Sequence, residues 1–135
     1  NSYFGEKDFQ QVKFINELVK IKNYKINIIS CPSIRDDLGM SLSSRNSKFN
    51  KGQYEIFKNL ANKIEKLIDL IKQRNSKIKL EDFSKDLSNI NINKIDYIEI
   101  RDEENLAITD NYTDARLFIA LYIDEIRIID NFKLY

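Results

Sequence analysis

The stretch Ala115-Arg-Leu-Phe-Ile-Ala-Leu-Tyr-Ile123, followed by Asp124-Glu125 and Ile126-Arg-Ile-Ile-Asp130, decides the fold of the larger part of this chain. Both apolar runs are rich in residues that favour strands, and the two acidic residues between them predict a tight turn. Ile95-Asp-Tyr-Ile-Glu-Ile100 predicts a further strand. We therefore expect a small antiparallel sheet in this part of the chain.

Helices are predicted before this sheet. Asn50 is a favourable N-cap, and Gln53 follows three residues later, as in a capping box. After it, apolar residues recur at helical spacing over about six turns: Ile56, Phe57, Leu60, Ile64, Leu67, Ile68 and Ile71. Beyond a break at Asn75-Ser76, a shorter helix is predicted from Leu80, Phe83 and Leu87. Helices followed by an antiparallel sheet indicate an α+β unit.

The N-terminal part has a different pattern. Residues 1–4 predict a strand end or loop, a helix is expected from about Asp8 to Lys22, and a short strand from Lys25 to Ser30 is stopped by Cys31-Pro32. The polar stretch from Ser33 to Asn50 is expected to separate two packing units, because long polar loops are functional or mobile more often than structural.

Composition excludes several classes of protein. With 42% apolar residues in 135, the chain can bury a core, which excludes a disordered tail. The 22 basic and 21 acidic residues give a net charge of +1, which argues against a nucleic-acid or membrane-surface partner. One Cys excludes an intramolecular disulfide and fits a reducing cytosol, and the absence of His excludes His-dependent catalysis and His-bound metals within these residues.

Two segments carry candidate chemistry. Gly5-Glu-Lys-Asp8 lies where a strand end meets a helix start, which favours an anion, and Lys7 adds a positive charge. Its alternative interpretation is a plain helix start, in which Asp8 and Gln11 form a capping box.

The second segment is Leu42-Ser-Ser-Arg-Asn46, which offers hydroxyl and guanidinium donors to phosphate oxygens. Its alternative is a polar loop that only precedes the next helix.

Taken together, these segments resemble the pantothenate synthetase (pantoate–β-alanine ligase) family. The resemblance rests on Phe4–Gln11, Cys31–Asp37, Leu42–Asn46 and Ile126–Asn131, with Asp96-Tyr97 at a D-Y strand start. Leu42–Asn46 is similar to the family's version of the mobile K-M-S-K-S loop. The chain departs from the family at Leu38, where an Asp is usual, and at Asp124-Glu125, where a Gly is common.

The resemblance implies a fold that combines α/β and α+β parts. Residues 1–40 would be the end of a Rossmann-like nucleotide-binding domain, and residues 41–135 a small C-terminal lid domain of helices and a short antiparallel sheet. It also implies that the chain is the C-terminal part of a longer enzyme, inactive by itself, whose proton-donor His lies upstream.

The implied reaction is ATP-dependent condensation of (R)-pantoate with β-alanine through a pantoyl adenylate, giving pantothenate, AMP and pyrophosphate. ATP with Mg²⁺ on the nucleotide, a homodimer and a cytoplasmic location are implied as well, with no metal held by this chain itself. Gln11 would bind pantoate. The residues implied in ATP binding are Gly5, Glu6, Lys7, Asp8, Ile34, Leu42, Ser43, Ser44 and Arg45.

Two other functions stay open at this point. One is a stand-alone, non-catalytic module that binds a phosphate ligand or a partner protein, which the absence of His favours. The other is a different adenylyl-transferring enzyme of the same superfamily, which Gln11 and the Glu-Lys-Asp context of Lys7 disfavour.

Overall fold

The computed structural model describes residues 1–74 and 79–135 and divides the chain into two compact units, Asn1–Ile34 and Arg35–Tyr135. The predicted helix break at Asn75-Ser76 lies outside the described residues. Residues 35–40, which we expected at the end of the first domain, group with the second unit.

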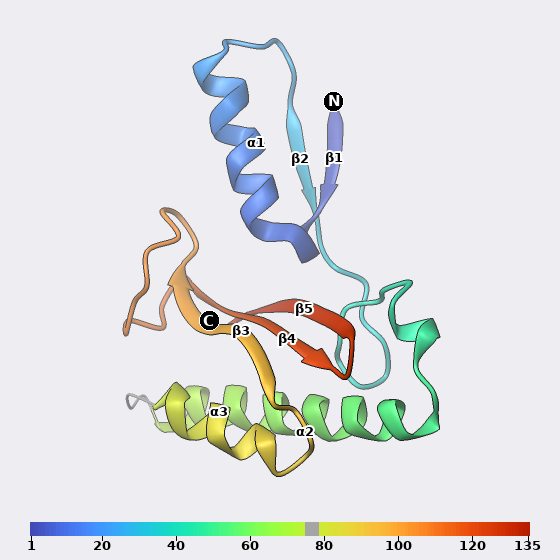
Figure 1. The fold of residues 1–135 in the computed structure, drawn as a ribbon. Helices are drawn as coiled ribbons and strands as arrows, with labels where there is room; N and C mark the ends of the chain where they lie inside the picture. The colour runs from blue at the N-terminus through green and yellow to red at the C-terminus, as the bar shows by residue number, and fades with distance from the viewer. Residues whose placement is uncertain (75–78) are drawn as a thin grey trace. The chain divides into compact units, whose positions relative to one another are not determined.

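The first unit is a strand–helix–strand arrangement (Figure 1). Strand β1 (Ser2–Gly5) leads through a 3₁₀ turn, η1 (Glu6–Asp8), into helix α1 (Phe9–Ile21), and strand β2 (Ile28–Cys31) returns parallel to β1. The second strand is shorter at its start than the predicted Lys25–Ser30 and includes Cys31. Its pairing is limited by β1, whose residues Ser2 to Gly5 match Ile28 to Cys31 one for one.

The second unit is the predicted α+β arrangement. It contains the 3₁₀ turn η2 (Asn46–Lys48), helices α2 (Lys51–Arg74) and α3 (Leu80–Ser88), and strands β3 (Lys94–Asp102), β4 (Ala115–Ile123) and β5 (Ile126–Lys133). The strands form an antiparallel sheet in the order β3-β4-β5. Strand β4 has the predicted bounds, whereas β5 continues past the predicted Asp130 to Lys133 because it pairs with β4 as far as Arg116.

Polar side chains fix the two sharp features of this unit. At the start of α2 the Gln53 amide N–H donates to Asn50 Oδ1 (2.9 Å) and the Asn50 N–H donates to Gln53 Oε1 (3.0 Å), which confirms the predicted capping box. In the hairpin between β4 and β5, Asp124 takes a left-handed conformation with φ 51°, the conformation for which a glycine is common. Gln53 Nε2 also donates to Asp124 Oδ2 (2.7 Å), so the helix start and the hairpin support each other.

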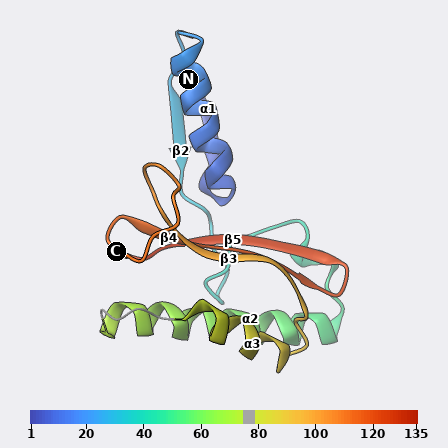
Figure 2. The same ribbon diagram turned by 60° about the vertical axis from the view of Figure 1, so that its left-hand side comes forward.

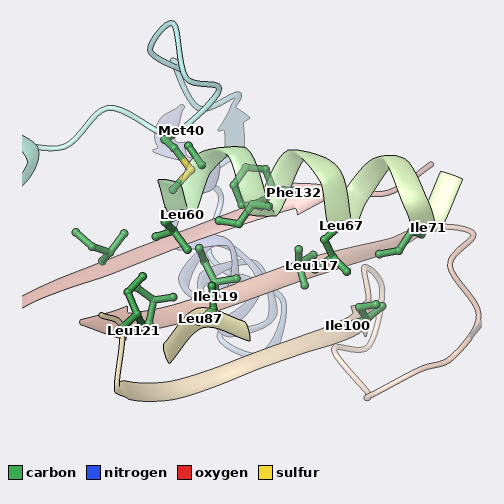
Figure 3. Packing of buried hydrophobic residues seen from close by; sticks show 14 of the residues in the cluster. Met40, Leu60, Leu67, Ile71, Leu87, Ile100, Leu117, Ile119, Leu121 and Phe132 are labelled. Atoms are coloured by element: carbon green, nitrogen blue, oxygen red, sulfur yellow. The ribbon is translucent and has the colours of Figure 1, made fainter. Parts of the chain in front are cut away.

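The core of the second unit lies between the sheet and its helices. Helices α2 and α3 cover the same face of the sheet (Figures 1 and 2). Figure 3 shows Leu60, Leu67 and Ile71 of α2 over Leu117 and Ile119 of β4, and all of them belong to one buried cluster. Met40, which precedes the second candidate segment, is buried in the same cluster. The base of that segment is therefore fastened to the core.

Candidate functional site

The first candidate segment lies where β1 ends and α1 begins. Gly5 closes the strand, the 3₁₀ turn η1 carries Glu6, Lys7 and Asp8, and α1 begins at Phe9. Ser30 Oγ of β2 donates to Glu6 Oε1 (2.9 Å), which ties the turn to the neighbouring strand. Phe9 is buried, so the start of the helix has a fixed footing. The first unit thus brings Gly5 to Asp8 together at a single strand-to-helix corner.

The fold does not require glycine at position 5. Gly5 has φ −73° and ψ 136°, which is ordinary extended backbone, and a Cβ added there would meet no other atom within 4 Å. The open space beside Gly5 is what close approach of a ligand to the backbone needs. The alternative interpretation of this segment, a capping box of Asp8 with Gln11, is not formed, because Asp8 makes no side-chain cap hydrogen bond.

Gln11 and Ile34 complete the candidate residues of the first unit. Gln11 lies in the first turn of α1, and its side chain is exposed. Val12, the next residue, is buried, and neighbours in a helix point about 100° apart, so Val12 faces the interior of the unit while Gln11 faces solvent. Ile34 ends the unit and is 75% exposed. Single exposed apolar side chains are common, so this exposure does not by itself indicate a ligand.

The second candidate segment is a tight polar turn in the second unit. Leu42 is 55% exposed, and Ser44 and Arg45 are also exposed. The Arg45 N–H donates to Ser43 Oγ (3.2 Å), the Asn46 N–H to the Ser43 carbonyl (3.0 Å), and Ser47 Oγ to the Ser44 carbonyl (2.8 Å). These bonds order the turn while the Arg45 side chain faces solvent. A turn of this kind offers hydroxyl and guanidinium donors to an anion.

Asp36 shapes the approach to this turn. Its Oδ1 accepts the N–H groups of Leu38 and Met40, both at 3.0 Å, and Gly39 between them has φ 75°. Position 38, where the family usually has an acidic residue, is therefore occupied by a Leu whose backbone is held by a neighbouring carboxylate. The departure leaves an ordered turn.

A buried polar group beneath the loop was missed by the sequence analysis. Asp130 and Asn131 of β5 and Ser41 are buried, and Arg35 reaches Asp130 with Nη1 at 3.2 Å. Ser41 Oγ donates to Asp130 Oδ1 (2.5 Å). The available signal was the polar pair Asp130-Asn131, which lies between the apolar residues Ile128-Ile129 and Phe132. Polar side chains that are buried in a strand need hydrogen-bond partners, but the sequence alone does not show which residues those partners are.

The shifted pKa values lie away from the candidate segments. A hydrogen bond from Lys63, helped by one from Asn89, lowers the pKa of the Asp86 carboxyl at the end of α3. A hydrogen bond to Asp96 raises the pKa of the Arg127 guanidinium, with Nε and Oδ2 2.8 Å apart. Both are structural ion pairs.

No group of three or more His, Cys, Asp or Glu side chains in residues 1–74 and 79–135 is arranged to hold a metal ion. None of the helices in the described part of the chain is long and apolar enough to cross a membrane.

Comparison with known proteins gives consistent matches over nearly the whole chain. The model of the family described as pantoate-beta-alanine ligase matches residues 1–133. A pantothenate synthetase of Clostridium novyi is 34% identical over 135 residues, which cover 97% of this chain and 47% of that protein.

Solved structures agree. The crystal structure of pantothenate synthetase from Thermus thermophilus has a TM-score of 0.85 at 27% identity and covers 98% of this chain and 49% of that one. The pantoate-beta-alanine ligase from Francisella tularensis, complexed with "Beta-gamma ATP" and β-alanine, has a TM-score of 0.71 at 32% identity, covering 98% of this chain and 42% of that one. The chain thus spans about half the length of the relatives it matches.

Proposed function

The chain belongs to the pantoate–β-alanine ligase family, and we propose that it serves in pantothenate synthesis by binding ATP and pantoate. The resemblance inferred from the sequence is confirmed, and a stand-alone non-catalytic module is not favoured. The observation that carries the proposal is the extent of the family match, residues 1–133. This match includes both candidate segments and residues 35–41, which form the base of the second segment.

The proposed reaction has two steps. The carboxylate of pantoate attacks the α-phosphorus of ATP and expels pyrophosphate, giving a pantoyl adenylate. The amine of β-alanine then attacks the activated carbonyl and expels AMP, giving pantothenate. Negative charge builds up on the leaving pyrophosphate in the first step, so donors placed around the phosphates are the groups expected to accelerate it.

Residues of the first unit supply the fixed part of this site in our proposal. Gly5 lets the nucleotide approach the backbone, Lys7 neutralises phosphate charge, and Glu6 and Asp8 line the same corner. The exposed amide of Gln11 binds pantoate, because an amide can both donate to a carboxylate or hydroxyl and accept from a hydroxyl.

Residues of the second unit supply the closing part. Leu42, Ser43, Ser44 and Arg45 would contact the triphosphate. Ile34, the last residue of the first unit, would lie against the nucleotide. The open polar turn found for residues 43–47 supports this assignment, because it orders the donors and leaves Arg45 exposed. Mg²⁺ would enter with the nucleotide, whose phosphate oxygens are the hard ligands that it prefers.

The architecture and setting are part of the same proposal. We assign the first unit to the end of a Rossmann-like nucleotide-binding domain and the second to the lid domain of the family. The parallel β1–β2 pair joined by α1 and the antiparallel sheet covered by two helices support that division. A cytoplasmic homodimer is the expected setting of the enzyme.

The proposal is tested by a chimera. The matched half of the Clostridium novyi relative is replaced by this chain, and the gene is placed in a bacterium that lacks its own pantothenate synthetase. We expect growth without added pantothenate, and pantothenate and AMP from the purified chimera. A folded chimera that binds ATP but makes no pantothenate would contradict the proposal.

Two controls sharpen this test. The 135 residues by themselves hold no His and are expected to make no pantothenate, so product from the purified chain would refute the assignment of roles. In the chimera, Gln11→Ala should raise the KM for pantoate about tenfold, or about 1.4 kcal/mol, and leave the KM for ATP nearly unchanged. Gln10→Ala is the matched control, because Gln10 is the exposed neighbour on the same helix.

A further inference from the structure

The base of the Leu42–Arg45 loop rests on a buried carboxylate. Asp130 lies in β5 and is only 3% exposed, in a strand whose Ile128 and Phe132 belong to the apolar core. A buried charge is costly unless it is paired and hydrogen-bonded. The position therefore needs partners, and the structure provides them from the loop.

Donors from both sides of the loop base converge on this carboxylate. Oδ1 accepts Ser41 Oγ (2.5 Å) and the Asn131 N–H (2.8 Å). Oδ2 accepts the Ser41 N–H (2.7 Å) and Arg35 Nη1 (3.2 Å). Ser41 is thus held by its backbone and its side chain at once, which fixes its orientation as well as its position.

Arg35 contacts both the loop base, residues 35–41, and strand β5. Its Nη1 also donates to the Gly39 carbonyl (2.8 Å), and its Nη2 donates to the Asn131 carbonyl (2.7 Å). Its guanidinium carbon lies 4.5 Å from the ring centroid of Phe132, within the range of a cation–π contact. Residues 35–41 are therefore tied to β5 at both ends.

Exposure changes sharply after Ser41. Met40 and Ser41 are 2% and 3% exposed, whereas Leu42 is 55% exposed. The buried part of the loop thus ends at Ser41, and the exposed part begins with the next residue, Leu42. A group that fixes Ser41 fixes the position from which Ser43, Ser44 and Arg45 extend.

We propose that Asp130 is a positioning residue for the Leu42–Arg45 loop: its carboxylate holds Ser41 and Arg35 so that the loop donors are presented in one arrangement. Asp130 is buried beneath the loop, so it acts through Ser41 and not on the ligand. The proposal rests on the proposed function for the identity of the ligand, and its anchoring part stands on the structure alone. Donors held in advance cost less ordering on binding.

The test compares Asp130→Asn with the unchanged chain. The asparagine has the same shape but places an NH₂ opposite the donors of Ser41 and Arg35. Hydrogen exchange without ligand should become about 10- to 100-fold faster at Ser41–Asn46, the effect of losing one charge-assisted bond. Exchange in β4 should be unchanged. Loop amides that exchange at the original rate would overturn the proposal.

MgATP supplies the second readout. Titration of the full chain, followed by amide chemical shifts of residues 42–46, should give an affinity about 10- to 100-fold weaker in Asp130→Asn. Equal affinities in the two chains would overturn the positioning role. If the unchanged chain shows no response to MgATP, the titration is made in the chimera, where an absence of binding would contradict the proposed function. The exchange comparison decides in either case whether Asp130 holds the loop.

Two further variants guard against unfolding. Ser41→Ala removes only the hydroxyl donor and should give the same two effects to a lesser extent. In the double variant with Asp130→Asn, Ser41→Ala should add little to either effect, because both substitutions break the same group of hydrogen bonds. Asp96→Asn is the matched control, because it breaks an ion pair of the same sheet, with Arg127, and should leave the loop unchanged. If Ser41→Ala leaves both readouts unchanged, Asp130 does not act through the Ser41 hydroxyl.

Discussion

The two units support their candidate segments in different ways. In residues 1–34, all of which the structure describes, Phe9 and Val12 are the buried apolar side chains. The second unit has a core that spans α2, α3 and the three strands. The Gly5–Gln11 segment therefore depends on the backbone geometry of a strand end and a helix start, whereas the Leu42–Arg45 loop depends on distant side chains. Ser41 and its partner Asp130 are 89 residues apart in the chain.

This difference says which substitutions should affect which segment. Local changes should alter the first segment, because its partners are close neighbours in the chain or lie on the adjacent strand. Changes far away in the sequence should alter the second, because β5 and the core hold its base. Substitutions in each unit can therefore test this contrast.

Truncation of a core side chain should separate the two units most clearly. Phe57 of α2 is 1% exposed and packs against Phe49, with ring centroids 5.1 Å apart. Phe57→Ala should lower the free energy of unfolding of the second unit by about 3–5 kcal/mol, because it leaves a cavity in a closely packed core. Urea denaturation followed by hydrogen exchange of β4 amides measures this loss.

The comparison is completed by two phenylalanines of α1. Phe9→Ala should cost less than Phe57→Ala, because few buried neighbours surround Phe9 in its unit and they can relax into the space. Phe14 is 67% exposed, so Phe14→Ala should change stability by no more than about 0.5 kcal/mol. Equal losses for Phe9 and Phe57 would show that the contrast in core support is wrong.

Most of the fold follows from sequence patterns that are local. Helical spacing from Ile56 to Ile71 and the capping box at Asn50 predicted α2, and β-rich runs predicted β4 and its hairpin. Errors occurred where pairing decides the bounds: β2 begins at Ile28, and β5 extends to Lys133. Propensity cannot locate such ends, because the length of the partner strand sets them.

The loop anchor was beyond sequence reasoning for a related reason. The Asp130-Asn131 pair was noted as a family resemblance, but its contacts with Arg35 and Ser41 arise only when the loop base folds onto β5. Local rules describe neighbours in the chain, and a buried charge is matched by residues brought together in space. The roles of the candidate residues stay predictions.

Removal of the loop guanidinium should have the next largest effect. In the chimera, Arg45→Ala should lower the rate of pantoyl adenylate formation about 30- to 1000-fold, or about 2–4 kcal/mol, because the proposed function assigns Arg45 to a loop that closes on the departing pyrophosphate. Single-turnover formation of the adenylate at saturating ATP measures it. Lys48→Ala is the control, since Lys48 is an exposed cation just beyond the turn.

The matching change in the first unit is Lys7→Ala. Removal of a fixed charge should weaken ATP binding more than it lowers the rate of adenylation at saturating ATP. The KM of the Lys7→Ala variant for ATP should therefore rise. Normal adenylation by Arg45→Ala would mean that the loop is only a polar connector. The contrast between a fixed segment and a closing segment would then be lost.

Addition of one methyl group at Gly5 should act in opposite directions on stability and binding. Alanine fits the extended backbone there, and its Cβ would meet no atom within 4 Å, so Gly5→Ala should stabilise the chain by about 0.4–1 kcal/mol through the unfolded state. MgATP affinity should fall about tenfold, or about 1.4 kcal/mol, if the nucleotide approaches this backbone. Thermal unfolding measures the change in stability, and MgATP titration measures the change in affinity. An unchanged affinity would mean that Gly5 has no role in binding.

The smallest expected effect is an acid-dependent one on the surface of the second unit. Hydrogen bonds from Lys63 and Asn89 lower the pKa of the Asp86 carboxyl from its ordinary value of 3.8. A lowered pKa in the folded state means that the pair stabilises the fold above the unfolded value, and that this stabilisation is lost as pH falls through the folded value. Asp86→Asn should therefore lower the urea midpoint slightly at about pH 7, and the difference from the unchanged chain should vanish at about pH 2.

Asp69→Asn is the control, because Asp69 is an exposed carboxylate on α2, and it should show no such convergence. A difference that stays constant across the acid range would show that the Lys63–Asp86 pair does not couple protonation to folding.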